Sequence, residues 1–277
     1  MASPRPVKVI AVTSGKGGVG KSSVSVNLAA ALARSGARVV LMDADLGLAN
    51  VDVLLGITPR YNLSHVIDGE VTLEEILVEG PEGMHIVPAS SGTKRMAELG
   101  PAENAGLIRS FSELGHDIDY LIIDTAAGIA DSVISFSRAA RDVLVVAQDE
   151  PSSITDAYAL IKVLNRDYQV RRMHVAANMI RDGRQGQSLY EKLLRVTDRY
   201  LDVTLNYLGG IPMDDKLRRA VKQQQAVVTA YPGSPAAQAY AELARRVDKL
   251  PAPAQAEGHL EFFVERLVQC SVGEVAS

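Results

Sequence analysis

Hydrophobic and polar positions divide the chain into short apolar runs and longer amphipathic stretches. The apolar runs are rich in β-branched residues and predict strands at 7–12, 38–42, 84–87, 120–123, 143–147, 173–177 and 203–208. Stretches with a helical repeat lie among them, at about 21–35, 94–99, 102–115, 131–140, 153–166, 184–199, 214–222 and 234–248. Several strands are apolar on both faces, which is typical of a sheet covered on both sides. The alternation predicts an α/β fold with a mostly parallel, twisted sheet flanked by helices on both faces.

The same pattern suggests one large domain followed by a short separate element. Residues 1–250 contain the alternating strands and helices, and residues 251–258 form a linker rich in Pro and Ala. Residues 259–277 are predicted to form a C-terminal amphipathic helix and tail. The apolar stripe of this helix consists of Leu260, Phe263, Val264, Leu267 and Val268.

Three interpretations of this C-terminal helix stay open from the sequence. It lies on a membrane surface, it docks in a groove of its own protein or of a partner, or it is an ordinary last helix of the core. Membrane-surface helices favour Lys and Arg on the polar face. Here that face carries Glu261 and Glu265 against Arg266, so any membrane contact is expected to be weak.

Composition excludes several classes of function. The formal net charge is −4, aromatic residues make up 5% of the chain, and there is no Trp. Neither a basic surface nor a base-stacking surface is therefore indicated, and no direct sequence-specific binding to nucleic acid is expected. The single Cys270 excludes an internal disulfide and a multi-cysteine metal site within one chain.

The N-terminal residues lack the apolar core of a signal peptide. No apolar run approaches the ~20 residues of a membrane-spanning helix. We therefore expect a cytoplasmic protein.

The most informative stretch runs from Gly15 to Ser22 and lies between a predicted strand and a predicted helix. It matches the pattern G-x-x-x-x-G-K-[ST], a phosphate-binding loop of ATP- and GTP-binding proteins. Glycines let successive N–H groups turn toward an anion, and the following helix directs its positive end at the phosphates. Lys21 is expected to reach the β- and γ-phosphates, and the Ser22 hydroxyl suits Mg²⁺. The predicted nucleotide-binding residues here are Gly15, Gly17, Gly18, Val19, Gly20, Lys21, Ser22 and Ser23.

Carboxylates follow two of the predicted strands at the edge where this loop lies. Asp43 and Asp45 follow one strand, and Asp124 ends the run Leu-Ile-Ile-Asp in the form of a Walker B strand. Such carboxylates orient an attacking water or hold Mg²⁺ through water, and an Asp in this place also serves as a helix N-cap. We expect Mg²⁺ at Ser22, Asp45 and Asp124. Gly128 would let the backbone approach the γ-phosphate and move when that phosphate leaves.

The loop sequence Lys-Gly-Gly-Val-Gly-Lys-Ser, which begins at Lys16, resembles the deviant P-loop of the MinD/ParA family of ATPases. The resemblance implies a dimer in the ATP state, in which Lys16 reaches the phosphates of the partner subunit. It also implies that Asp45 positions the hydrolytic water and that Asp43 supports the site, so Lys16, Lys21, Asp43 and Asp45 are the predicted catalytic residues. The family usually has Pro where this chain has Ala126, which puts the stiffness of that turn in doubt.

Adenine recognition is predicted by the same resemblance. The sequence lacks the guanine-binding motif Asn-Lys-x-Asp, which favours ATP over GTP as the nucleotide. Residues at two further strand ends match positions that contact adenine in MinD-like proteins: Asn178, Pro212, Met213 and Asp214. The alternatives for these residues are a turn asparagine and a helix cap.

Within the family, several segments look most similar to the flagellar-number regulators of the FlhG/FleN branch. These segments are 43–56, 62–63, 86–92, 152–162 and 259–269. The resemblance implies a protein that restrains the AAA+ flagellar transcription activator FleQ, with slow ATP hydrolysis resetting the dimer. It is compatible with a peripheral position at the inner membrane or the cell pole.

Three other members of this fold are the rival interpretations. The first is a membrane-associated division-site ATPase of the MinD type, and the second is a DNA-partition ATPase of the ParA type. The third is an iron–sulfur carrier, which needs paired cysteines to hold a cluster. The single Cys270 weighs against this third rival.

Overall fold

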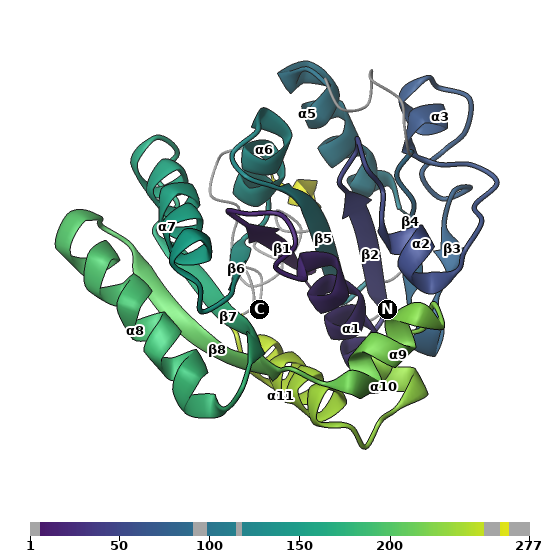
Figure 1. Cartoon of the computed structure of the whole chain (residues 1–277). Helices are drawn as coiled ribbons and strands as arrows, with labels where there is room; N and C mark the ends of the chain where they lie inside the picture. Colours follow the sequence, from purple (N-terminus) through teal and green to yellow (C-terminus); the bar gives the residue numbers. More distant parts are fainter. Residues whose placement is uncertain (1–5, 91–98, 115–117, 252–260, 266–277) are drawn as a thin grey trace, which may run out of the picture.

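A computed structural model describes residues 6–90, 99–114, 118–251 and 261–265 of the chain. In this described part, the strands are β1 (Lys8–Ser14), β2 (Val39–Ala44), β3 (Val78–Glu79), β4 (His85–Val87), β5 (Tyr120–Ala127), β6 (Asp142–Ala147), β7 (Arg172–Ile180) and β8 (Thr204–Pro212). They form one eight-stranded sheet in the order β3-β4-β2-β5-β1-β6-β7-β8. Every neighbouring pair is parallel except β3 with β4. The predicted mostly parallel sheet is confirmed (Figure 1).

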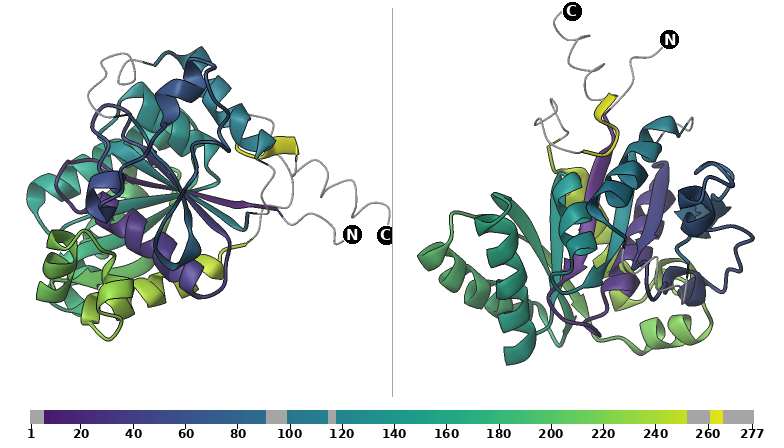
Figure 2. Two further views of the ribbon diagram at one scale, coloured as in Figure 1. Left: turned by 90° about the vertical axis from the view of Figure 1, so that its right-hand side faces the viewer. Right: turned by 90° about the horizontal axis from the view of Figure 1, so that it is seen from above.

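Helices cover both faces of this sheet, as Figures 1 and 2 show. The α-helices are α1 (Lys21–Arg34), α2 (Val51–Leu55), α3 (Leu63–Ile67), α5 (Pro101–Ser110), α6 (Asp131–Ala139), α7 (Pro151–Arg166), α8 (Gly183–Tyr200), α9 (Asp215–Lys222), α10 (Val227–Ala230) and α11 (Pro235–Asp248). Two 3₁₀ turns are η1 (Pro81–Gly83) and η2 (Phe111–Glu113). Buried residues of α1, α10 and α11 pack in one core cluster. Residues of α5 to α8 pack in two others on the opposite face.

The central strands are buried on both faces because both of their faces carry apolar residues. Every residue of β2 and β6 is buried, and so is β5 up to Thr125. Strands β5, β7 and β8 continue past the predicted ends at 123, 177 and 208. The added residues still pair with neighbouring strands, for example Ala127 of β5 with Ser14 of β1 and Asn178 of β7 with Ile211 of β8. The extensions carry the backbone to the edge where the predicted site residues lie.

Several short elements were not predicted from the sequence. Helices α2 and α3 have five residues each and α10 has four, and β3 has two. Elements this short span little more than one period, so a hydrophobic repeat cannot identify them. The predicted helix at 94–99 falls almost entirely outside the described residues.

The described part of the C-terminal element packs on the chain's own core. Phe262 and Phe263 are buried, and the Phe262 ring lies 5.1 Å from that of Phe111 in an edge-to-face arrangement. The Phe262 N–H donates to the carbonyl of Ala139 at the end of α6. Phe263 has a φ of 55°, so the backbone is not a regular helix at this residue. Both aromatic rings are buried, although the predicted apolar stripe includes Phe263 and not Phe262.

Docking on its own protein is thus the interpretation that fits residues 261–264. Val264 is half-buried beside the two aromatic residues. Leu260, Leu267 and Val268 of the predicted stripe lie outside the described residues. Across the described ranges, no helix has the length and apolar character needed to cross a bilayer.

Replacing Phe262 by alanine tests this docking. The change removes a fully packed ring, and large-to-small changes of this kind cost about 3 kcal/mol. We expect Phe262→Ala to lower the free energy of unfolding by about that amount in a urea titration. Ile129→Ala, at a side chain that is 54% exposed, is the control and should change it by no more than about 0.5 kcal/mol. Equal urea midpoints for Phe262→Ala and the parent protein would show that the segment does not stabilise the core.

Candidate nucleotide-binding site

A glycine-rich turn joins the end of β1 to the start of α1. Because β1 ends at Ser14 and α1 begins at Lys21, the turn lies at the carboxyl edge of the sheet. Gly18 and Gly20 have φ angles of 79° and 85°, a left-handed conformation that side chains disfavour. Gly20 is the N-cap residue of α1, so the helix directs its free N–H groups and positive end into the turn. The geometry is that of an anion-binding loop.

The turn is held in place by two neighbouring segments. A Cβ on Gly15 would lie 2.1 Å from the backbone carbonyl of Asp156, so Gly15 contacts the backbone of α7 directly. On the other side, the Gly128 N–H donates to the Ser14 carbonyl at 2.8 Å. A shift of this loop therefore displaces α7 and the turn after β5 with it.

A buried ion pair joins α1 to β5 at this edge. Lys21 Nζ lies 2.8 Å from Asp124 Oδ1, with the two side chains 8% and 0% exposed. The Ser25 hydroxyl donates to the same oxygen at 2.8 Å. The other oxygen, Asp124 Oδ2, is buried without a hydrogen-bond partner. A buried acceptor without a partner is costly, so a donor or a hydrated cation at this oxygen would be stabilised.

Asp43 lies beside Asp124 in the sheet and holds the loop after β2. The two residues are direct neighbours in the register of β2 and β5. One oxygen of Asp43 accepts from the N–H groups of Asn50 and Val51, and the other accepts from Asp45 N–H. Burial, and then the nearby charge of Asp124, raise the pKa of Asp43 to about 7. Asp43 is thus a positioning residue that fixes the start of α2.

Asp45 differs from Asp43 because β2 ends between them, at Ala44. Its side chain is partly buried, and Asp45 Oδ1 accepts from the Leu48 N–H at 3.3 Å. Partial burial raises the pKa of Asp45, and the charge of Lys21 opposes that rise. Asp45 therefore lies near enough to Lys21 to interact with it electrostatically, and it is the more accessible of the two carboxylates.

Lys16 turns away from the loop toward the start of α7. Its Nζ donates to the Ser152 hydroxyl at 2.9 Å and lies 3.7 Å from a Glu150 oxygen. The Lys16 side chain is 41% exposed and that of Glu150 is 59% exposed. Exposed pairs of this kind contribute about 0–1 kcal/mol. The second cation of the loop is therefore held loosely at the rim of the site.

Asn178 at the end of β7 contacts the loop directly. Its side-chain NH₂ donates to the Val19 carbonyl at 2.7 Å. A Cβ on Gly20 would lie 2.3 Å from this nitrogen, and the left-handed φ of 85° also disfavours a side chain there. Asn178 Oδ1 is buried without a partner. An amide oxygen in that state is an acceptor suited to the exocyclic amine of a base.

The segment after β8 completes this side of the site. Asp214 Oδ1 accepts from the Lys216 N–H, and Asp214 Oδ2 accepts from the Ala236 N–H, at 2.7 and 2.9 Å. Asp214 is therefore the N-cap of α9 and joins that helix to α11. A helix cap was the alternative to an adenine contact that the sequence left open for this residue. Pro212 ends β8, and the Met213 side chain is exposed.

Several side chains at this edge were not identified from the sequence as site residues. Gln148 Nε2 donates to the Gly18 carbonyl and lies 3.0 Å from the Met179 sulfur. Ser25 shares Asp124 with Lys21, and Ser152 accepts from Lys16. No motif marks these residues, because their contacts depend on how α1, β6 and α7 are packed. The strand-end position of Gln148, directly after β6, was the one available signal.

The residues at this edge fit Mg²⁺ better than a metal held by protein ligands alone. In the described ranges, no group of three or more His, Cys, Asp or Glu side chains is placed to hold a metal. Mg²⁺ commonly uses one or two protein oxygens together with water and phosphate. Ser22 in the first turn of α1 and the partner-free Asp124 Oδ2 are oxygens of that kind.

Comparison with known protein families gives a match across the whole predicted domain. The sequence model of a family described as ParA, "NUBPL iron-transfer P-loop NTPase", matches residues 6–248. The match includes the glycine-rich loop and every strand and α-helix up to α11.

Two curated proteins with flagellar names are similar to this chain. "Antiactivator FleN" of Pseudomonas aeruginosa is 58% identical over 269 residues, which are 97% of this chain and 96% of that protein. "Flagellum site-determining protein YlxH" of Helicobacter pylori is 37% identical over 219 residues, which are 79% of this chain and 74% of that protein.

Among solved structures, the septum site-determining protein MinD of Pyrococcus horikoshii, complexed with Mg-ADP, has a similar fold. The TM-score is 0.73 at 28% identity, and the match covers 88% of this chain and 96% of that one.

Substitutions at two glycines of the same loop test its close contact with α7. Gly15→Ala places a methyl group against the Asp156 carbonyl and should lower the free energy of unfolding by about 2 kcal/mol. Gly17→Ala has nothing within 4 Å of the added Cβ and should change it by less than about 1 kcal/mol. Both are measured by urea denaturation without nucleotide. Equal stabilities of the two variants would contradict the observed packing.

Proposed function

Since the chain belongs to the ParA/MinD family of P-loop NTPases, we propose that it is an ATP-dependent dimeric switch that regulates flagellar number. In its ATP state it binds and restrains a flagellar transcription activator, and slow hydrolysis resets the dimer. The observation that carries this proposal is the 58% identity to the antiactivator FleN over 97% of the chain. The second flagellar relative supports the same process.

The loop between β1 and α1 binds the triphosphate in this proposal. The backbone N–H groups of residues 15–20 and the N-terminus of α1 face the anion. Lys21 exchanges part of its interaction with Asp124 for the β- and γ-phosphates. Asn178 Oδ1, together with the backbone around Pro212 and Met213, faces the adenine.

Ser22, Asp45 and Asp124 are the proposed ligands of Mg²⁺, directly or through water. When bound, this ion neutralises charge on the phosphate oxygens. Asp45 orients the attacking water because it is the accessible carboxylate near Lys21. Asp43 keeps the loop that carries Asp45 in place through its three backbone hydrogen bonds.

Lys16 makes the site depend on a second subunit. In the single chain it rests on Ser152 and Glu150 through exposed contacts that are weak. We propose that it leaves them in the ATP state and reaches the phosphates of the partner subunit. The turn at Gly128, hydrogen-bonded to Ser14, transmits the presence of the γ-phosphate to α6.

The family description also mentions iron transfer, and that activity is not proposed for this chain. Carriers of iron–sulfur clusters use paired cysteines, whereas the sequence contains Cys270 alone.

Lys16→Ala tests the cross-subunit role. It should leave ATP binding within about threefold of the parent protein, because the Lys16 side chain points away from the loop toward Ser152 and Glu150. It should abolish ATP-dependent dimerisation, seen by light scattering, and lower ATP hydrolysis at least tenfold. Lys162→Ala on α7 removes the same charge from an exposed position and is the matched control. Dimerisation and hydrolysis equal to those of the parent would refute the role.

The partner assignment is tested by binding to an AAA+ flagellar transcription activator from the same organism. With ATP the protein should retain the activator on a column, and with ADP it should not. Lys21→Ala, which removes the cation expected at the β- and γ-phosphates, should abolish the ATP effect. Retention that is absent, or equal with both nucleotides, would rule out the antiactivator role. That result would leave the proposed role of Lys16 in dimerisation open to its own test.

A further inference from the structure

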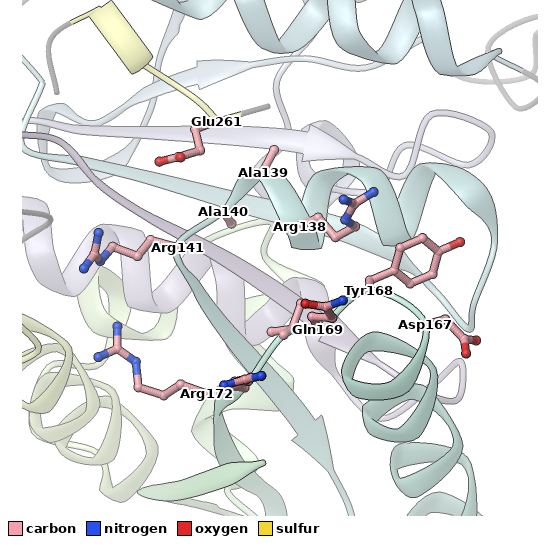
Figure 3. Close-up of a pocket in the computed structure, with 11 residues that line it drawn as sticks. Arg138, Ala139, Ala140, Arg141, Asp167, Tyr168, Gln169, Arg172 and Glu261 are labelled. Atoms are coloured by element: carbon pink, nitrogen blue, oxygen red, sulfur yellow. The ribbon is translucent and has the colours of Figure 1, made fainter. Parts of the chain in front are cut away.

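A hollow lies at the edge of the sheet opposite the nucleotide site. Its volume is about 700 Å³, and it is bounded by the segment between α6 and β6 and by the segment between α7 and β7. Strands β6 and β7 begin there, at Asp142 and Arg172, whereas the glycine-rich loop follows the end of β1. Glu261 of the C-terminal segment forms one wall (Figure 3). This pocket takes no part in the function proposed above.

Guanidinium groups dominate the polar lining of the pocket. The basic residues are Arg138, Arg141, Arg171 and Arg172. The acidic residues of the lining are Asp167 and Glu261. An excess of cations in one hollow is unexpected by composition, because the whole chain has a net charge of −4.

The structure holds two of these arginines in defined positions. The Arg138 guanidinium lies over the Tyr168 ring, 4.9 Å from its centroid. Arg172 contacts Asp142 at 3.1 Å, and the same carboxylate oxygen is 2.9 Å from His174 Nε2. Figure 3 shows Arg138 and Arg172 on different sides of the hollow. Guanidinium groups thus face the pocket from both of its bounding segments.

Arg171 is held much more weakly. Its Nε lies 3.8 Å from Asp202, and the two side chains are 73% and 91% exposed. Such a pair contributes little and is easily exchanged for a better one. Arg171 can therefore turn toward an anion without a large cost.

We propose that this pocket binds a small molecule through its phosphate groups. A guanidinium presents parallel N–H donors that match two oxygens of one phosphate. A phosphate carries more oxygens than a carboxylate and arranges them in three dimensions, so it can accept from arginines on opposite walls. The volume falls in the range of roughly 300–1,000 Å³ that small-molecule sites occupy.

Glu261 sets how tightly this site binds. Its carboxylate lines the same hollow, so a bound phosphate meets a like charge there. The adjoining Phe262 and Phe263 anchor the segment in the core, which keeps Glu261 in the wall. The arginines and Glu261 therefore affect phosphate binding in opposite directions.

The test uses inorganic pyrophosphate as the probe, titrated calorimetrically into the full-length protein. The double variant Arg138→Gln, Arg171→Gln removes two charges and spares Arg172, whose loss would leave buried Asp142 without that partner. It should lose one pyrophosphate site relative to the parent, or bind there at least about tenfold more weakly. Arg195→Gln on α8 makes the same chemical change on an exposed helix surface and should bind like the parent. Sites in the phosphate loop contribute equally to all three proteins.

Glu261→Gln should tighten binding at this site by about threefold. Far-ultraviolet circular dichroism and the urea midpoint confirm that each variant is folded. Pyrophosphate binding that is the same in the parent, the double arginine variant and Glu261→Gln overturns the proposal.

Vesicles distinguish the two sources of such a phosphate group. Sedimentation with phosphatidylglycerol vesicles, lost in the double arginine variant and absent with phosphatidylcholine, assigns the pocket to a lipid headgroup. Arginine-dependent pyrophosphate binding without vesicle sedimentation assigns it to a soluble phosphorylated molecule.

Discussion

The buried pair of Lys21 and Asp124 is the interaction on which the rest of the site depends. It joins α1 to β5 at the carboxyl edge of the sheet, where burial makes an unpaired charge very costly. Asp124 cannot lose Lys21 to a phosphate unless another cation or donor replaces it, and its second oxygen is already without a partner. Binding of a triphosphate and binding of a cation are thus coupled by the need to keep Asp124 compensated. Asp43 lies next to Asp124 in the sheet, and the charge of Asp124 helps to raise the pKa of Asp43. Because Asp43 also accepts hydrogen bonds from the loop after β2, it connects that loop to the ion pair.

Much of this fold follows from local sequence, because the central strands are apolar on both faces and the long helices carry clear repeats. The phosphate loop is also readable from its sequence, since glycine is the residue that most readily adopts the φ angles at 18 and 20. Short elements such as α2 and α10 are not readable, because one helical turn gives no repeat. The contacts between side chains at the sheet edge cannot be read from the sequence, because they depend on how distant segments pack together. Gln148 reaches Gly18, and Ser25 reaches Asp124, only because β6 and α1 lie where the sheet order places them.

The C-terminal segment shows how a periodic pattern can miss part of a buried surface. A helical stripe placed Phe263 on an apolar face and left Phe262 off it. The structure buries both rings, and the backbone at Phe263 is left-handed rather than helical. Two adjacent aromatic residues enter one core through an irregular turn, where the rings pack edge-to-face against Phe111. Periodicity assumes regular backbone, and it fails where a short segment is shaped by the surface that it contacts.

The two lysines of the loop differ in how strongly the single chain holds them. Lys21 is buried against a charge that it cannot leave uncompensated, whereas Lys16 makes exposed contacts worth about 0–1 kcal/mol. A side chain held so weakly is released by a modest gain elsewhere, and in the proposed dimer a phosphate of the partner subunit would supply that gain. Two contacts join this part of the loop to α7. Gly15 packs against the helix backbone at Asp156, and Lys16 donates to the Ser152 hydroxyl. The start of α7 is therefore the element whose contacts would change if Lys16 left Ser152 for a partner subunit, as the proposed switch requires.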